Sequence, residues 1–313
     1  MTLTRLSAAL ISAVTLALPA HSAEPEQCRT VTFSDVGWTD ITATTALTTT
    51  VLEALGYQTD TRLLALPVTF TALATGDIDV FLGTWMPTMA ADVAPYLDTG
   101  TIDRVRVNLT GAKYTLATNK AGADLGIRDF ADIAAQKQAL DGKIYGIEPG
   151  NDGNRLLLEM VAMDQFGLGT FEVIESSEQG MLAQVARADT AGRPVVFLGW
   201  EPHPMNNQFE LTYLTGGDDL FGPNLGGAEV QTVSRAGYVA ECENVGRLLH
   251  NLEFTLDAEN QVMARILNDG QDPAAAARDW LRDNPDAAVA WLHGVTTVDG
   301  NDAETALTAA LAR

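Results

Sequence analysis

Short apolar segments alternate with helix-like segments along this chain, and this alternation limits the possible fold more than any other feature. Strands are expected at residues 31–36, 61–66 and 79–83. Helices are expected between them, at residues 42–55 and 67–76, each closed by a glycine. This βαβαβ order predicts a mostly parallel sheet with helices on its faces, so the expected fold class is α/β.

The same rhythm resumes after a break. Further strands are expected at residues 114–118, 143–147, 171–175, 195–198 and 229–234, with helices at residues 129–140, 154–166 and 177–188. The stretch 207–227 is rich in Gly, Asp and Asn, which is typical of an irregular connection. Everything beyond residue 243 is helical in character. Two α/β units followed by helices predict two lobes.

The N-terminal residues have the pattern of an export signal. Arg5 precedes an apolar run of 15 residues, 6–20, which is shorter than the ~20 residues that a transmembrane helix needs. Ala20 and Ala23 are both plausible last residues before cleavage, although neither gives an ideal small-x-small site. We expect residues 1–23 to be a signal peptide and the mature chain to be a soluble, exported protein.

The charge excludes several classes of partner. The chain has 41 acidic and 19 basic side chains, which give a formal charge of −22. Nucleic-acid binding needs a basic surface to neutralise phosphates, and docking to anionic lipid needs a polybasic patch, so neither is expected. Solubility is the simplest interpretation of the excess of acids.

The two cysteines, Cys28 and Cys242, lie far apart in the sequence. In an oxidising compartment an even pair most simply forms one disulfide. Two unpaired buried thiols are the alternative, and a metal site is not expected because no His or second Cys lies near either one.

Large polar and aromatic side chains follow the predicted strands. Trp38 and Asp40 follow the first strand, Trp85 the third, and Asn151 and Trp200 follow strands of the second unit. Ligands of open α/β sheets bind beyond the carboxyl ends of the strands. A single Trp is more often packing than ligand site, but three of them at strand ends, each close to a Gly, favour a site. Electron-rich rings without a cluster of Lys or Arg suit a quaternary ammonium ligand.

Three polar residues have two interpretations each. Asp40 is either the N-cap of the following helix or the acceptor for a ligand hydroxyl. Asn151 could cap the next helix and could also reach a ligand. Tyr114 begins the first strand of the second unit, where packing is also possible.

The remaining candidates are weaker. No phosphate loop, HExxH, GxSxG or dinucleotide fingerprint is present. His203, between two prolines, is expected to be a turn residue, and Trp280 and Trp291 are expected to be core. Glu148, Asp152 and Glu201 lie near the predicted site and could form an acid/base pair, but in so acidic a chain they are expected to be solvated carboxylates.

Several long segments carry a family resemblance. They are FSDVGWTDITATTA, VLEALGY, DIDVFLGTWMPTM, GAKYTLA, DGKIYGIEPGNDGN, ESSEQGMLAQVARA, VFLGWEPHPMN and GGDDLFGPN. From Cys28 to at least Trp291, the chain resembles the glycine betaine and choline substrate-binding proteins of bacterial ABC importers, and most closely their choline-binding branch.

The resemblance implies a type II periplasmic substrate-binding protein, in which two α/β lobes close like a Venus flytrap. Two crossing strands at the hinge are implied near residues 113–114 and 229–232. Lobe I would contain residues 24–113 plus 231–313, and lobe II residues 114–230. The helical tail then returns to lobe I, where Cys28 and Cys242 can pair.

The resemblance also implies a site and a function. An aromatic box would be formed by Trp38, Trp85, Tyr114 and Trp200. Asp40 and Asn151 would hold the choline hydroxyl. The implied protein is a monomeric periplasmic receptor that captures choline, with acetylcholine as a further candidate, and delivers it to an ABC permease without cofactor or covalent chemistry. One alternative is a glycine betaine receptor, although the carboxylate of that ligand would fit poorly beside Asp40. Two others are a receptor that delivers its ligand to a chemosensor and not to a transporter, and an esterase, for which the chain has no recognisable nucleophile motif.

Overall fold

The computed structural model describes residues 24–313, so the expected signal peptide, residues 1–23, lies outside the described residues. The first α/β unit contains β1 (Thr30–Asp35), α1 (Thr39–Ala54), β2 (Gln58–Leu63), α2 (Leu66–Thr75), β3 (Val80–Met86) and α3 (Ala90–Asp98). Strand β1 pairs in parallel with both β2 and β3, which confirms the expected βαβαβ order.

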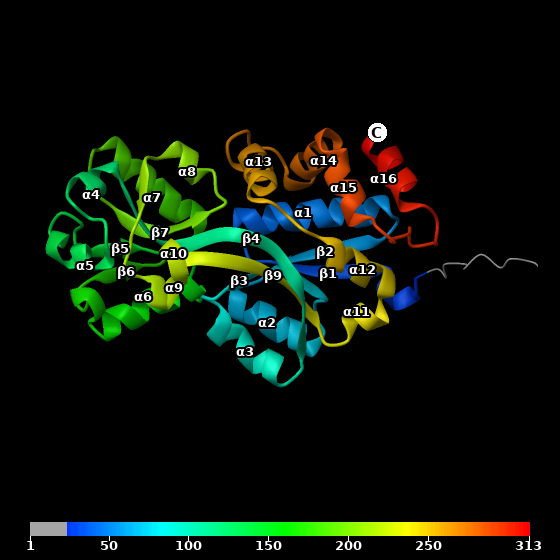
Figure 1. Cartoon of the computed structure of the whole chain (residues 1–313), viewed down its shortest axis with the longest axis horizontal. Helices are drawn as coiled ribbons and strands as arrows, with labels where there is room; N and C mark the ends of the chain where they lie inside the picture. Colours follow the sequence, from blue (N-terminus) through cyan, green and yellow to red (C-terminus); the bar gives the residue numbers. More distant parts are fainter. Residues whose placement is uncertain (1–23) are drawn as a thin grey trace, which may run out of the picture.

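The second unit contains α4 (Lys120–Asp124), α5 (Phe130–Ile133), β5 (Lys143–Tyr145), α6 (Asp152–Ala162), β6 (Glu172–Ile174), α7 (Glu178–Thr190), β7 (Val196–Glu201), α8 (Met205–Gln208), β8 (Leu211–Tyr213), α9 (Asp218–Phe221) and α10 (Pro223–Gly226). Strand β5 pairs in parallel with β6 and β7. In Figure 1 these elements form one group at the left, and the first unit lies in a second group at the right.

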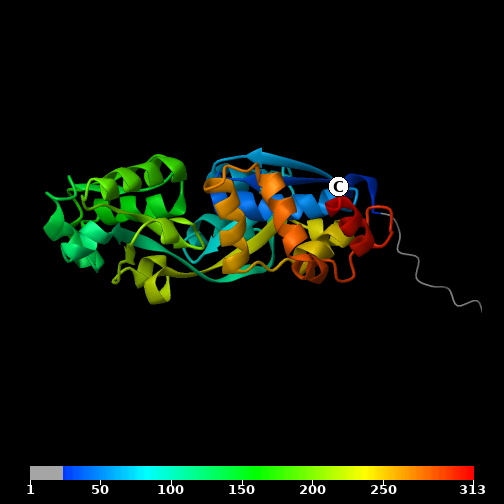
Figure 2. The same cartoon turned by 90° about the horizontal axis from the view of Figure 1, so that it is seen from above.

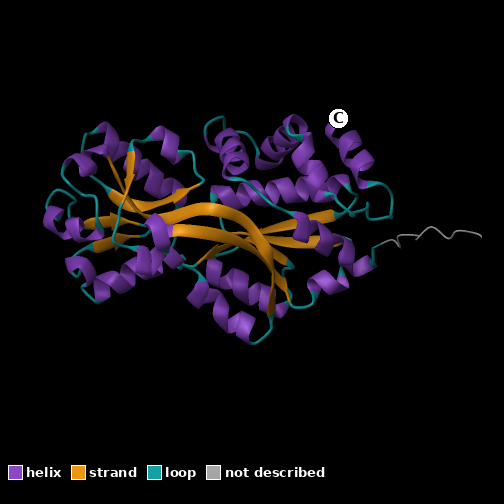
Figure 3. Cartoon of the chain, viewed as in Figure 1, coloured by secondary structure: helices purple, strands orange, loops and turns teal. Residues whose placement is uncertain are grey.

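Two long strands, β4 (Ile102–Asn119) and β9 (Gly227–Arg235), join the two groups (Figures 1 and 3). They are antiparallel neighbours in the middle of one nine-stranded sheet with the order β2-β1-β3-β9-β4-β7-β5-β6, and β8 pairs with β4. Lys113 faces Gly227 of β9 and Glu201 of β7, so at this residue β4 passes from one group to the other. The α/β class and the two crossing strands are confirmed.

The C-terminal helices are α11 (Tyr238–Glu241), α12 (Glu243–Asn251), α13 (Leu256–Leu267), α14 (Pro273–Asp283), α15 (Pro285–Trp291) and α16 (Ala303–Leu311). Helices α13, α14 and α16 pack on α1, so the end of the chain returns to the first unit (Figures 1 and 2). Trp280 and Trp291 are buried and stacked there, as expected for core residues. We call β1–β3, α1–α3 and α11–α16 the first half, and α4–α10 with β5–β8 the second half.

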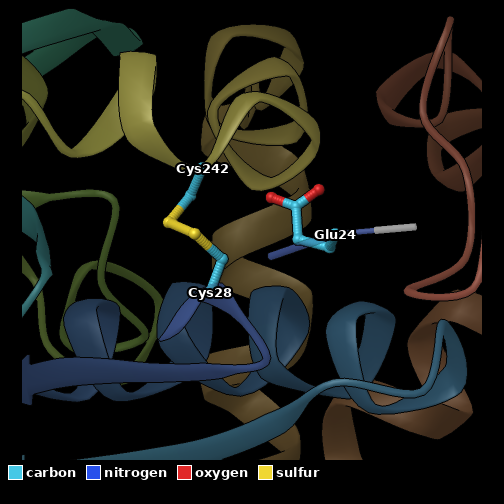
Figure 4. A group of neighbouring side chains, drawn as sticks. All are labelled: Glu24, Cys28 and Cys242. Carbon is cyan, nitrogen blue, oxygen red and sulfur yellow. A yellow bond between two sulfur atoms is a disulfide. The ribbon is translucent and has the colours of Figure 1, made fainter. Parts of the chain in front are cut away.

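A disulfide joins the two chain segments that make up the first half. Cys28 and Cys242 are bonded to each other and fully buried, with their Cα atoms 5.5 Å apart. The carboxyl group of Glu24 lies beside them (Figure 4), and burial raises its pKa. Because each sulfur atom is bonded to the other, neither is a thiolate that could bind a metal, and the alternative of two free thiols is wrong.

Four expected elements differ from the structure. Strand β2 begins three residues before the expected start. The prediction placed it too late because its side chains are mostly exposed and polar, while the apolar residues counted as its end belong to the start of α2. Strand β4 begins at Ile102, twelve residues before the expected start. The expected helix at 129–140 contains only α5 and a 3-10 turn, and the irregular stretch 207–227 contains β8, α9 and α10. Within residues 24–313, none of the helices has both the length and the apolar character needed to cross a membrane.

Candidate functional site

A small cavity lies where the two halves meet. The residues that line it come from both halves and are Trp38, Asp40, Trp85, Met89, Tyr114, Ile147, Asn151, Asp152 and Trp200. The structure therefore brings together all six residues that the sequence singled out, although they span more than half of the chain.

The strands place the aromatic side chains. Tyr114 on β4 lies directly opposite Trp200 on β7, so both rings occupy the same face of the sheet. The centroid of the Tyr114 ring is 6.3 Å from that of Trp200 and 6.0 Å from that of Trp85, and both contacts are edge-on. Trp38 contributes a further wall, and all four side chains are buried. Ring faces around a small cavity are suited to a diffuse positive charge.

The ring of Trp38 is fixed from the opposite half. Its Nε1 donates to Glu148 Oε1 across 2.8 Å. Glu148 follows β5 and is half-buried, and burial raises the pKa of its carboxyl group. The expectation that Glu148 is simply a solvated carboxylate is therefore wrong. Glu201 is also half-buried and forms an ion pair with Lys113.

Asp40 has one bonded and one unbonded carboxyl oxygen. Trp85 Nε1 donates to Oδ2 across 3.1 Å, whereas Oδ1 is buried and has no partner among the described residues. The N-cap of α1 is Trp38 and Asp40 lies within the first turn, so the N-cap interpretation of Asp40 is wrong. Burial, and secondarily the nearby Glu178 carboxylate, raise the pKa of Asp40 to about 8. An unpaired buried acceptor at a cavity wall is suited to a ligand donor.

Asn151 caps α6 and still has a free hydrogen-bond donor at the cavity. Its Oδ1 accepts from the backbone N–H of Asn154, which makes it the N-cap of α6, and also from the hydroxyl of Tyr114 at 3.0 Å. Its Nδ2 donates to Asp152 Oδ1 across 3.0 Å, leaving a second N–H for another acceptor. The cap therefore holds the amide against the cavity without using all of its hydrogen-bonding capacity.

Asp152 is a site residue that the sequence analysis missed. It is only 1% exposed, so its expected role as a solvated carboxylate is wrong. Burial raises its pKa to about 7, and Oδ2 has no partner among the described residues. The two carboxyl groups of Asp40 and Asp152 face the cavity, and no Lys or Arg lies among the residues that line it. A ligand with a positive charge fits these surroundings, and an anionic group does not.

His203 was expected to be a turn residue, but it is only 1% exposed. Its ring lies 4.9 Å from that of Trp200, measured between centroids, and its Nε2 lies 3.2 Å from Glu178 Oε1. Glu178 was not singled out by the sequence. Neither residue lines the cavity, and both lie directly behind its walls.

Comparison with known proteins finds solved structures that are similar over most of the chain. The chain is 66% identical to an ABC-transporter choline-binding protein solved in complex with choline, with a TM-score of 0.91 over 92% of this chain and 100% of that one. The same kind of protein in an unliganded semi-closed conformation is 65% identical, with a TM-score of 0.85 over the same shares. The lactococcal OpuAC bound to glycine betaine, 23% identical with a TM-score of 0.75 over 84% of this chain and 98% of that one, shares the fold.

Relatives found by sequence are more distant or shorter. An uncharacterised protein of Chromohalobacter salexigens is 45% identical over 152 residues, which are 49% of this chain and 96% of that protein. The glycine betaine/carnitine transport binding protein GbuC of Listeria monocytogenes is 29% identical over 60% of this chain and 58% of its own length. The model of the OpuAC family, described as the substrate binding domain of ABC-type glycine betaine transport systems, matches residues 29–283. The chain belongs to this family of transport proteins.

Proposed function

We propose that this chain is an exported receptor that binds choline and delivers it to the membrane permease of an ABC importer. The observation that carries the choice of ligand is the pairing of an aromatic box with the unbonded Oδ1 of Asp40. The rings would hold the trimethylammonium group and the carboxyl oxygen would accept a hydrogen bond from the hydroxyl. The high identity to a choline-binding protein that contains choline supports this proposal.

The proposed box consists of Trp38, Trp85, Tyr114 and Trp200, and Asp40 and Asn151 are proposed to hold the hydroxyl. A desolvated cation–π contact contributes up to ~2 kcal/mol, so several of them are enough for micromolar binding. Acetylcholine has the same cationic group and is proposed as a second ligand. Asp152 lines the same cavity and adds a second carboxyl group to it.

The proposed movement is closure of two lobes, residues 24–113 plus 231–313 and residues 114–230, about β4 and β9. Each lobe contributes part of the box, so closure completes the site and presents a different surface to the permease. Cleavage after residue 23 and residence in the periplasm as a monomer complete the proposal.

Glycine betaine is the second candidate, because the family model describes glycine betaine transport. Its carboxylate would lie in a cavity lined by Asp40 and Asp152 and by no Lys or Arg. Two like charges in a desolvated site repel, so we expect betaine to bind more weakly than choline.

Calorimetric titration of the mature protein with choline, acetylcholine, glycine betaine and 3,3-dimethyl-1-butanol tests the proposal. The last compound has the shape of choline without its charge. We expect choline to bind at least about 100-fold more tightly than this neutral analogue, since two cation–π contacts would be lost with the charge. Tighter binding of betaine than of choline would overturn the choice of ligand, and equal binding of the neutral analogue would overturn the aromatic cation site.

A further inference from the structure

Behind the cavity, one buried carboxylate from the second half bonds to the first half. Glu178 is in the first turn of α7 and is only 1% exposed. Its Oε2 accepts from the backbone N–H of Thr39 across 2.8 Å, and its Oε1 accepts from the hydroxyl of the same residue. Thr39 is the first residue of α1, where a backbone N–H has no acceptor within its own helix. The second half therefore supplies the acceptor that the N-terminus of α1 lacks.

A third donor comes from His203. Its Nδ1 accepts from the backbone N–H of Met205 across 3.0 Å, so the ring proton belongs on Nε2. Nε2 then donates to Glu178 Oε1 across 3.2 Å. With this donor and the two from Thr39, the buried carboxylate has three hydrogen bonds, which offset the cost of removing its charge from water.

These contacts reach both walls of the cavity. Thr39 lies between Trp38 and Asp40 in the sequence, and the ring of His203 packs against that of Trp200. One carboxylate is therefore tied to the segment that carries two site residues of the first half and to an aromatic wall of the second. Opening the halves must break the two bonds to Thr39 and return a charged group and a helix N-terminus to water.

Other contacts between the halves are nearer to solvent. Arg155 on α6 donates to the backbone carbonyl of Thr88 and to Asp92 of the first half, but its side chain is 30% exposed. Water competes for such a contact and salt screens it. The bonds of Glu178 are buried, so their contribution to the closed state is larger.

We propose that Glu178 is a positioning residue that locks the closed state and holds Trp38, Asp40 and Trp200 around the ligand. This inference rests on the proposed function. Because Glu178 does not line the cavity, it acts on how long a ligand stays and not on which ligand is chosen.

The test compares Glu178→Gln with the wild type by stopped-flow Trp fluorescence, using choline and acetylcholine. The amide keeps the size of the side chain but loses the charge and offers a donor where Thr39 also donates. We expect choline to dissociate at least about tenfold faster, because a buried charged hydrogen bond is lost, while the association rate changes less than threefold. At pH 9, above the pKa of about 8 of Asp40, that carboxyl group is mostly ionised with or without the charge of Glu178, so the ratio of choline to acetylcholine affinity at this pH stays within twofold of the wild-type ratio.

Two further variants complete the test. Thr39→Val removes the hydroxyl donor and keeps the backbone N–H, so we expect a smaller increase in the dissociation rate and no further increase when it is added to Glu178→Gln. Glu172→Gln, at an exposed position of β6, is the matched control and leaves both rates unchanged. Thr39→Val also tests the inference if Glu178→Gln does not fold.

The outcomes separate the two proposals. Wild-type protein that binds neither choline nor acetylcholine would overturn the proposed function, and the locking role with it. Wild-type protein that binds choline, with Glu178→Gln and Thr39→Val releasing it at the wild-type rate, would overturn the locking role alone. A changed choline-to-acetylcholine ratio in Glu178→Gln would also overturn it, because that result assigns Glu178 to ligand selection.

Discussion

The carboxyl group of Asp40 shows how a single residue can make binding depend on pH. Its pKa of about 8, raised first by burial and then by Glu178, leaves it mostly protonated at pH 7 in this ligand-free structure. A bound cation favours the carboxylate and lowers this pKa. Binding therefore releases protons, and the affinity for choline rises with pH until it levels off above about pH 8.

Calorimetry measures this release directly. Titrations at the same pH in phosphate and in Tris, whose ionisation enthalpies differ, should give different heats with the wild type between about pH 7 and 8. The Asp40→Asn variant removes the contribution of this carboxyl group and should reduce the difference, leaving what the buried Asp152 contributes with its pKa of about 7. Equal heats in both buffers for the wild type would contradict the prediction.

Asp40 should also decide between ligands. At pH 9, above the pKa of about 8 of Asp40, Asp40→Asn keeps the shape of the side chain and removes the charge that repels the carboxylate of glycine betaine. We expect the variant to bind choline about tenfold more weakly than the wild type does and to bind betaine no more weakly. The preference for choline over betaine is then smaller in the variant. Parallel titrations with the two ligands give the ratio, and a ratio equal to that of the wild type would remove Asp40 from ligand selection.

The residues that the sequence could and could not predict differ in how they are placed. Trp38, Trp85 and Trp200 were found because they end or follow strands, and the edge of a sheet gathers such positions regardless of their distance in sequence. Glu178 and His203 have no such local mark. Their roles arise from contacts with residues far away in the sequence, Thr39 for Glu178 and Glu178 for His203. These roles could be recognised only from the structure, which shows how the two halves pack together.

At the scale of elements, the first turn of α6 packs closely against Tyr114 at the cavity. Gly153 is in its first turn, and a Cβ atom at this position would meet the hydroxyl of Tyr114. Alanine normally stabilises a helix relative to glycine by up to about 1 kcal/mol. Here we expect Gly153→Ala to displace Tyr114, to weaken choline binding at least tenfold and to leave the melting temperature no higher than that of the wild type.

A second change provides the control. Tyr114→Phe removes the hydroxyl, the atom nearest to the new Cβ, and leaves the ring carbon Cζ at 2.7 Å, so the clash is reduced. Gly153→Ala combined with Tyr114→Phe should therefore bind choline more tightly than Gly153→Ala alone. Fluorescence titration of the four proteins completes the cycle. Additive effects of the two substitutions would show that the clash does not determine affinity.

The elements that were predicted well are those with a buried face. Strand β3, buried along six of its seven residues, was recognised from its apolar run. Strand β4 was recognised only at its buried end, because Asp103, Arg104 and Arg106 in its first part resemble a surface loop. Strand β2 is an edge strand with exposed polar side chains, and its hydrogen bonds to β1 follow from the neighbouring strand and not from its own pattern.

At the scale of the whole molecule, the disulfide should act on stability and leave binding unchanged. Cys28 and Cys242 are 214 residues apart, and closing so long a loop reduces the entropy of the unfolded chain by an amount worth up to ~5 kcal/mol. Neither residue lines the cavity. We expect the double variant Cys28→Ser, Cys242→Ser to have a lower free energy of unfolding by a few kcal/mol, with the dissociation constant for choline within twofold of the wild type.

Urea unfolding followed by circular dichroism checks the first part of this prediction, and calorimetry with choline checks the second. The wild type in reducing agent should behave as the double variant does, if the reagent reaches the buried bond. A double variant as stable as the oxidised wild type would contradict the prediction. A large loss of affinity would show that the disulfide region reaches the site.

The path of the chain has a consequence for the order in which the molecule is built. The strands of the second half fall in one continuous stretch and can pair as soon as that stretch has been made. In the first half, the edge of β3 must wait for β9, and α1 stays uncovered until α13, α14 and α16 have been synthesised. The core of the first half is therefore completed only when the segments on the two sides of the second half meet.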